Sequence, residues 1–249
     1  MPLCFNLFAK LHCEPAAAAT VLGVVLGLDV ATVEEVLVEH APPAAKQLLG
    51  DRTAFDAFVR YRTAGGASGF LGIETKYTEP FSPTSFPPGR YEPSPAFTAA
   101  GFAPGAAARL AGPATNQLLR NTLLAAATRH TGGYDLGHAV VLTGRDDRAA
   151  RRAVGLVRAE LAEPDRLLRW LSLERLVEQC QLEARLAAWA ARFRRRYLDL
   201  SPVASRFPVP ADCPSDGATH TPKMGRSSSE VIQGTAGGGS AARVMVVPP

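Results

Sequence analysis

Two side chains of opposite charge, Glu74 and Lys76, lie two residues apart in the apolar stretch 69–80, GFLGIETKYTEP. This stretch predicts a β-strand that ends in a turn at Pro80. Residues two apart in a strand point to the same face, so we expect Glu74 and Lys76 to lie side by side. A carboxylate and an ammonium group are costly to bury unless each has a partner. A site that binds a metal ion together with a phosphate would use both groups.

A third charged residue, Asp56, is the single acid in the preceding stretch 53–62, TAFDAFVRYR, which also has strand character. The glycine-rich segment 63–68, TAGGAS, predicts a hairpin turn between the two strands. If the strands pair about the centre of this turn, the numbers of paired residues sum to about 131, and Asp56 lies opposite residue 75. We therefore expect Asp56 to converge with Glu74 and Lys76. A structural salt-bridge cluster on the hairpin surface is the alternative.

Apolar periodicity and turn signals predict the elements that would position this hairpin. Helices are expected over 15–28, 115–130, from Asp146/Asp147 to about 161, and over 173–197 as one long helix, and further strands over 32–40, 136–143 and 167–171. Together they describe a mixed α/β domain with a central sheet. The Pro-, Gly- and Ser-rich segment 81–113 is expected to be an irregular functional loop or lid, with Tyr91, Phe97 and Phe102 anchoring it to the surface.

Length and composition fit one domain over residues 1–204 followed by a disordered, low-complexity tail over 205–249. The net charge of +4 is compatible with a polyanionic partner without requiring one. The arginine clusters 148–152 and 192–196 could contact nucleic-acid phosphates, or could simply interact favourably with helix dipoles.

The cysteines and the hydropathy pattern indicate a cytoplasmic protein without membrane association. The four cysteines show no CxxC pairing, so we expect reduced thiols. No uncharged apolar run reaches 18 residues, and no basic segment precedes the apolar N-terminal run as it would in a signal peptide.

The hairpin and the helix beginning near Gln117 together resemble the active core of the PD-(D/E)XK nuclease superfamily. Five blocks are similar to a bacterial family of restriction-endonuclease-like proteins in that superfamily: LCFNLF (3–8), DRTAFDAFVRYR (51–62), GIETKYTEPF (72–81), QLLRNTLLA (117–125) and RRYLDLSPV (195–203). The resemblance covers residues 3–204. It implies an α-β-β-β-α-β core with a mixed sheet flanked by helices.

Carried over position by position, the resemblance makes Asp56 and Glu74 the metal-binding carboxylates, Lys76 the catalytic lysine and Gln117 the polar helix residue beside the site. Phe55 stands where the superfamily's name has proline. The family typically carries a further helical segment, often with an acidic residue, before the block at 3–8. We therefore expect this chain to be an N-terminally truncated member.

The resemblance implies a Mg²⁺-dependent endonuclease that hydrolyses phosphodiester bonds, most naturally in DNA, with Mn²⁺ as a possible substitute. Two carboxylates suffice to hold Mg²⁺ against a phosphate, because this ion prefers hard oxygen ligands and keeps several waters. A homodimer would supply two active sites for cutting both strands. Two alternatives stay open: a nuclease-fold protein that binds nucleic acid or a partner without cleavage, and an unrelated α/β domain with a structural charged hairpin.

Overall fold

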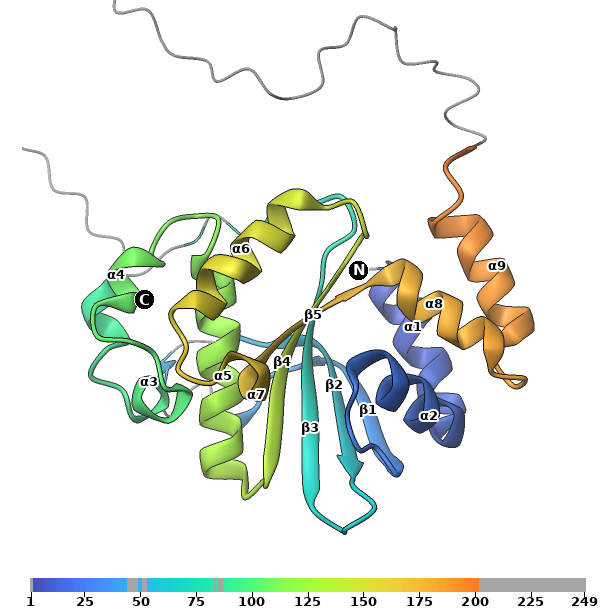
Figure 1. Cartoon of the computed structure of the whole chain (residues 1–249), viewed down its shortest axis with the longest axis horizontal. Coiled ribbons are helices and arrows are strands. Elements are labelled where there is room, and N and C mark those ends of the chain that lie inside the picture. The colour runs from blue at the N-terminus through green and yellow to red at the C-terminus, as the bar shows by residue number, and fades with distance from the viewer. Residues whose placement is uncertain (1, 44–48, 51–52, 83, 85–86, 202–249) are drawn as a thin grey trace, which may run out of the picture. The chain divides into compact units, whose positions relative to one another are not determined.

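The computed structural model describes residues 2–43, 49–50, 53–82, 84 and 87–201, and the predicted tail 205–249 lies outside them. A mixed five-stranded sheet forms the centre, in the order β1-β2-β3-β4-β5 (Figure 1). The strands are β1 (Thr32–His40), β2 (Phe55–Arg62), β3 (Ser68–Thr75), β4 (Leu136–Thr143) and β5 (Leu168–Ser172). The first three strands pair antiparallel, and β4 and β5 run parallel to β3. The predicted mixed α/β architecture is confirmed.

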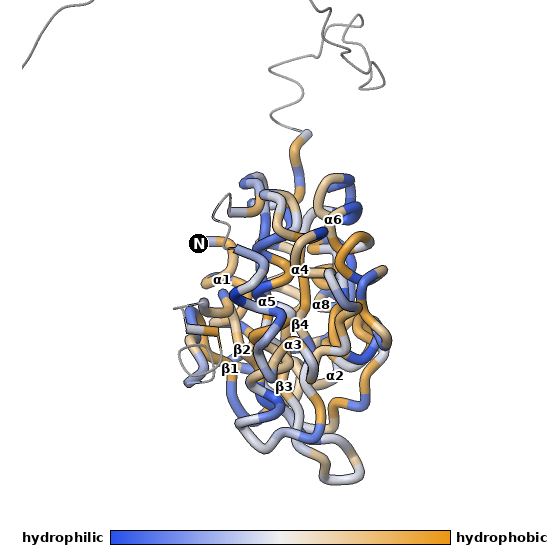
Figure 2. Tube along the Cα trace, turned by 90° about the vertical axis from the view of Figure 1, so that its left-hand side faces the viewer, coloured by the Kyte–Doolittle hydropathy of each residue, from blue (hydrophilic) through white to orange (hydrophobic). Residues whose placement is uncertain are grey.

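Helices cover both faces of the sheet (Figure 1). One face is covered by α1 (Pro2–Cys13), α2 (Pro15–Leu26), α8 (Leu173–Leu182) and α9 (Ala187–Tyr197). The other carries α3 (Pro95–Ala100), α4 (Ala106–Arg109), α5 (Asn116–Gly132), α6 (Arg148–Ala159), α7 (Pro164–Leu167) and the 3₁₀ turn η2 (Pro88–Arg90). Each face has its own hydrophobic core, because successive strand residues point to opposite sides: Leu71 and Ile73 enter the first core, and Phe70 enters the second. Figure 2 shows hydrophobic residues along the central elements and hydrophilic ones in many of the outer turns.

Local signals account for several element ends. The helix predicted over 15–28 ends at Leu26, because Gly27 adopts a left-handed conformation with φ of 62° and caps it. Asp147 caps the N-terminus of α6, where its carboxylate accepts a hydrogen bond from the Ala150 N–H at 2.8 Å. None of the described helices is long and apolar enough by itself to cross a membrane, although α1 and α2, bent by 117°, reach that length and composition as a pair.

The single long helix predicted over 173–197 is wrong. The chain forms α8 and α9 instead, separated by a turn at residues 183–186. The N–H groups of Leu186 and Ala187 both donate to the Glu183 carbonyl at 2.9 Å, which redirects the chain. Leu182 before the turn is 79% exposed, whereas Leu186 after it is fully buried. The turn therefore lets α9 place its own apolar face in the core beside α8.

The irregular lid predicted over 81–113 is also wrong for the described part of that segment. It folds into η2, α3 and α4, of which α3 packs beside α5 and α4 contacts η2. Tyr91, Phe97 and Phe102 are buried in the second core rather than anchored at the surface. The rings of Phe97 and Phe102 stack with centroids 5.2 Å apart. The segment is thus a small helical layer that completes one face of the domain.

Aromatic rings lie directly over glycines of neighbouring strands within the sheet. The pairs are Tyr61 over Gly69, Phe55 over Gly72 and Phe70 over Gly137. A Cβ atom added at any of these glycines would lie less than 3.0 Å from ring carbons, closer than real Cβ atoms come. Each glycine is therefore required by the ring that covers it.

Candidate active site

The charged residues predicted from the hairpin meet where β2 begins and β3 ends. Ala57 pairs with Ile73, so Asp56 falls opposite Glu74, one position from the predicted register. Glu74 lies on the face of the sheet that α5 covers, since Gln117 and Asn121 of α5 both donate to it. Lys76 pairs with Glu74, and the charges of Glu74 and Lys76 both act on the Asp56 carboxyl group. The structure brings all three together with Gln117 of α5.

Glu74 is held by three hydrogen-bond donors although its side chain is only 5% exposed. Its Oε1 accepts from the Gln117 amide at 2.6 Å and lies 2.8 Å from the Lys76 ammonium group. Its Oε2 accepts from the Asn121 amide at 2.8 Å. Donors on both oxygens fix the orientation of this buried carboxylate.

Asn121 was not among the predicted site residues. It lies one helical turn after Gln117, and residues four apart on a helix project from the same side. That spacing, Gln-x-x-x-Asn, is the sequence signal that could have found it. Arg120, on the neighbouring helix position, donates to the Thr53 hydroxyl at 2.5 Å and ties α5 to the segment that leads into β2.

Asp56 has a different environment from Glu74. Its Oδ2 accepts a hydrogen bond from the Thr75 N–H at 2.7 Å. Burial, and then the negative charge of Glu74, raise the pKa of Asp56 to about 6, and this effect exceeds that of the Thr75 hydrogen bond. The buried thiol of Cys4 on α1 donates to the Asp56 carbonyl at 3.5 Å. Burial raises the pKa of Cys4 to about 11, so this residue is a thiol at neutral pH.

Lys76 lies one residue beyond the end of β3. The strand was predicted over 69–80, but it stops at Thr75. Its N–H still donates to the Leu142 carbonyl at 2.9 Å, which continues the pairing with β4. Its ammonium group lies 5.7 Å from the centroid of the Phe81 ring. Gln117 connects this segment to Glu74, because its carbonyl oxygen accepts from the Ser82 N–H at 2.6 Å while its amide donates to the carboxylate.

The donor set fits a hard divalent cation with partial hydration. In the described part of the chain, no group of three or more His, Cys, Asp or Glu side chains is arranged so that it could hold a metal ion by itself. Asp56 and Glu74 nevertheless supply two carboxylates whose mutual repulsion contributes to the raised pKa of Asp56. A cation placed between them would relieve that repulsion, and Mg²⁺ commonly binds through one or two carboxylates while phosphate and water oxygens complete its shell.

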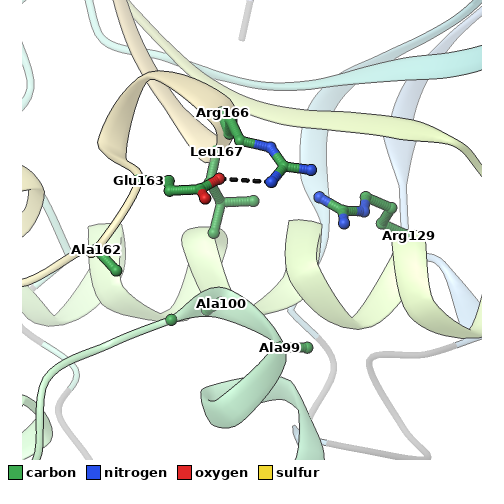
Figure 3. A pocket seen from close by; sticks show the side chains of 8 residues that line it. Ala99, Ala100, Arg129, Ala162, Glu163, Arg166 and Leu167 are labelled. Carbon is green, nitrogen blue, oxygen red and sulfur yellow. Dashed lines mark hydrogen bonds and ion pairs between the residues drawn. The ribbon is translucent and has the colours of Figure 1, made fainter.

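A separate hollow of about 240 Å³ lies near the far end of α5 (Figure 3). Figure 3 shows Arg129 and Arg166 pointing into it, and Arg166 forms an ion pair with Glu163 at 2.5 Å. Arg129 follows Gln117 by twelve residues, which corresponds to about 18 Å along the helix. The hollow is therefore remote from the carboxylate cluster.

Comparison with known proteins gives one match. A family model described as the PD-(D/E)XK nuclease superfamily matches residues 1–199. No curated protein and no solved structure matches the chain significantly.

Proposed function

The chain belongs to the PD-(D/E)XK nuclease superfamily, and from this premise we propose that it is a Mg²⁺-dependent endonuclease that hydrolyses phosphodiester bonds of DNA. The observation that carries the proposal is the buried cluster in which Glu74 is oriented by Lys76, Gln117 and Asn121, next to Asp56. Cytoplasmic location and homodimer formation stay predictions.

Asp56 and Glu74 are the residues that would hold the metal ion. When bound, the ion would supply positive charge that polarises the phosphoryl oxygen and acidifies the attacking water. Because three donors fix its orientation, Glu74 would meet the ion with little reorganisation. Asp56, with its pKa raised to about 6, would be mostly ionised at pH 7 and above.

Lys76 would act on the phosphate. Its ammonium group already lies at the carboxylate cluster, and its side chain keeps 12% exposure. A substrate phosphate could therefore approach it without a rearrangement of β3. In that position Lys76 would donate to a phosphoryl oxygen, orient the attacking water and offset charge that develops on the phosphorus.

Two arginine-rich helices support a polyanionic substrate. The helices α6 and α9 carry four arginines each and no acidic residue. Figure 1 shows both helices toward the end of the sheet where β3 terminates. The exposed arginines Arg148, Arg151 and Arg152 on α6 and Arg192, Arg195 and Arg196 on α9 could neutralise phosphates on either side of the cluster.

A plasmid cleavage assay tests the proposal. Wild-type protein is expected to cut DNA with Mg²⁺ or Mn²⁺, and Lys76→Ala and Asp56→Ala are expected to lower the rate by about 100-fold or more. Lys10→Ala is the matched control, since Lys10 on α1 forms a partly exposed ion pair with Glu14, the residue that follows this helix. Equal activity of wild type, Lys76→Ala and Asp56→Ala would remove the catalytic assignment. DNA binding by the wild type without cleavage would favour a role in binding alone.

A further inference from the structure

A mostly apolar hollow of about 390 Å³ opens directly beside the carboxylate cluster. Its lining includes Lys76, Phe81, Pro113, Ala149 and Ala150. This volume falls within the range of about 300–1,000 Å³ that is typical of small-molecule sites. The hollow adjoins the candidate active site, because Lys76 belongs to both.

The rim of the hollow carries charges of both signs: Lys76, which is ion-paired with Glu74 at 2.8 Å, and the acids Glu79 and Asp147. The Asp147 carboxylate accepts a hydrogen bond from the Ala150 N–H and so caps the N-terminus of α6. Glu79 likewise accepts hydrogen bonds from the N–H groups of Tyr77 and Thr78, at 3.4 and 3.1 Å. Both carboxylates keep their negative charge but accept hydrogen bonds from neighbouring N–H groups, and the exposed Arg148 adds positive charge next to the hollow.

We propose that this hollow binds an unpaired nucleobase next to the scissile phosphate, so that the preferred substrate is single-stranded or locally unwound DNA. The ammonium group of Lys76 lies 5.7 Å from the centroid of the Phe81 ring. One sugar joins a base to its phosphate, so a base stacked on Phe81 would have its phosphate beside Lys76. A paired base cannot enter, because in a duplex its faces are stacked and its edge points inward.

This inference rests on the proposed nuclease function, and a binding assay separates the two. Fluorescence anisotropy would measure the affinity of the full chain for a labelled single strand and for the same sequence as a duplex, with Ca²⁺ in place of Mg²⁺. Phe81→Ala removes the stacking surface. Ala149→Trp fills the hollow from an exposed helix position, so it serves as a second variant that does not depend on losing a packed side chain.

Single-strand affinity is expected to fall about 5- to 150-fold in Phe81→Ala, the range for losing one base–aromatic stack. Ala149→Trp should show a loss of similar size, while duplex affinity changes less than about twofold. The matched controls Phe5→Ala, whose ring is 60% exposed on α1, and Ala159→Trp, at the other end of α6, should behave as wild type. Unchanged single-strand affinity in both test variants, equal losses on duplex, or no single-strand binding by the wild type would overturn the inference. Cleavage lost in Lys76→Ala but unaffected by Phe81→Ala would retain the nuclease and reject the base site.

Discussion

Replacement of Asp56 by asparagine should make the metal-free protein more stable at pH 8, although it removes a proposed metal ligand. The Asp56 carboxyl group has its pKa raised from 3.8 to about 6, mainly by burial and then by the charge of Glu74. The folded pKa thus lies above the unfolded pKa, and the folded protein loses stability as the pH rises from about 4 through about 6. Asparagine does not titrate, and its carbonyl oxygen can still accept the hydrogen bond from Thr75.

The size of the effect follows from the pKa difference. A rise from 3.8 to about 6 corresponds to about 3 kcal/mol of unfolding free energy, fully expressed at pH 8 and absent below about pH 4. Asp56→Asn should therefore exceed the wild type by at most about 3 kcal/mol at pH 8 and match it at pH 4. Mg²⁺ at a hundred times its dissociation constant should add about 2.7 kcal/mol to the wild type and little to the variant.

Urea unfolding followed by the fluorescence of Trp170 and Trp189 measures these differences, at pH 4 and pH 8, with EDTA or with Mg²⁺. Asp165→Asn is the matched control, because Asp165 is exposed and pairs with Arg158 at 2.7 Å. Its stability difference from the wild type should not depend on Mg²⁺. An Asp56→Asn protein no more stable than the wild type at pH 8 in EDTA would refute the electrostatic account of this site.

Two further substitutions test how the site is supported. Asn121→Ala leaves Oε2 of the buried Glu74 without its hydrogen-bond donor. We therefore expect a loss of about 1–3 kcal/mol of unfolding free energy and a lower kcat at similar KM. A variant with the stability and the kcat of the wild type would contradict the positioning role of Asn121. Gly72→Ala forces a Cβ atom against the Phe55 ring and should lower the free energy of unfolding in urea by about 1–3 kcal/mol. Gly89→Ala is the control and should leave stability unchanged, because a Cβ atom at Gly89 would have no atom within 4 Å. Equal stability of the two variants would argue against the ring contact.

The charged hairpin could be predicted because its signals are local. Glu74 and the single Asp56 lie in two apolar runs joined by a glycine-rich turn, and that pattern places both near one end of the hairpin. The register differed by one position because Arg62 already pairs with Ser68, so the loop holds five residues, 63–67, rather than six. The hydrogen bond from the Thr63 N–H to the Ala67 carbonyl at 3.0 Å closes this shorter loop, and composition alone does not specify it.

Other features depend on contacts between distant parts of the chain. The role of Asn121 requires α5 to be docked on β3, and the turn before Leu186 depends on which leucine reaches the core. The ends of helix α3, by contrast, are marked by local capping residues. They were missed because the Pro-, Gly- and Ser-rich composition of segment 81–113 favoured an irregular loop. Ser94 caps it by accepting from the Phe97 N–H at 3.2 Å, and Gly101 ends it with φ of 71°.

The rings that rest on bare glycines determine more than local packing. A slip of one residue between β2 and β3 would drive the Phe55 ring into a side chain instead of Gly72. The same slip would carry Asp56 out of line with Glu74. The packing of the uncharged Phe55 ring on Gly72 therefore fixes the strand register that places Asp56 opposite Glu74.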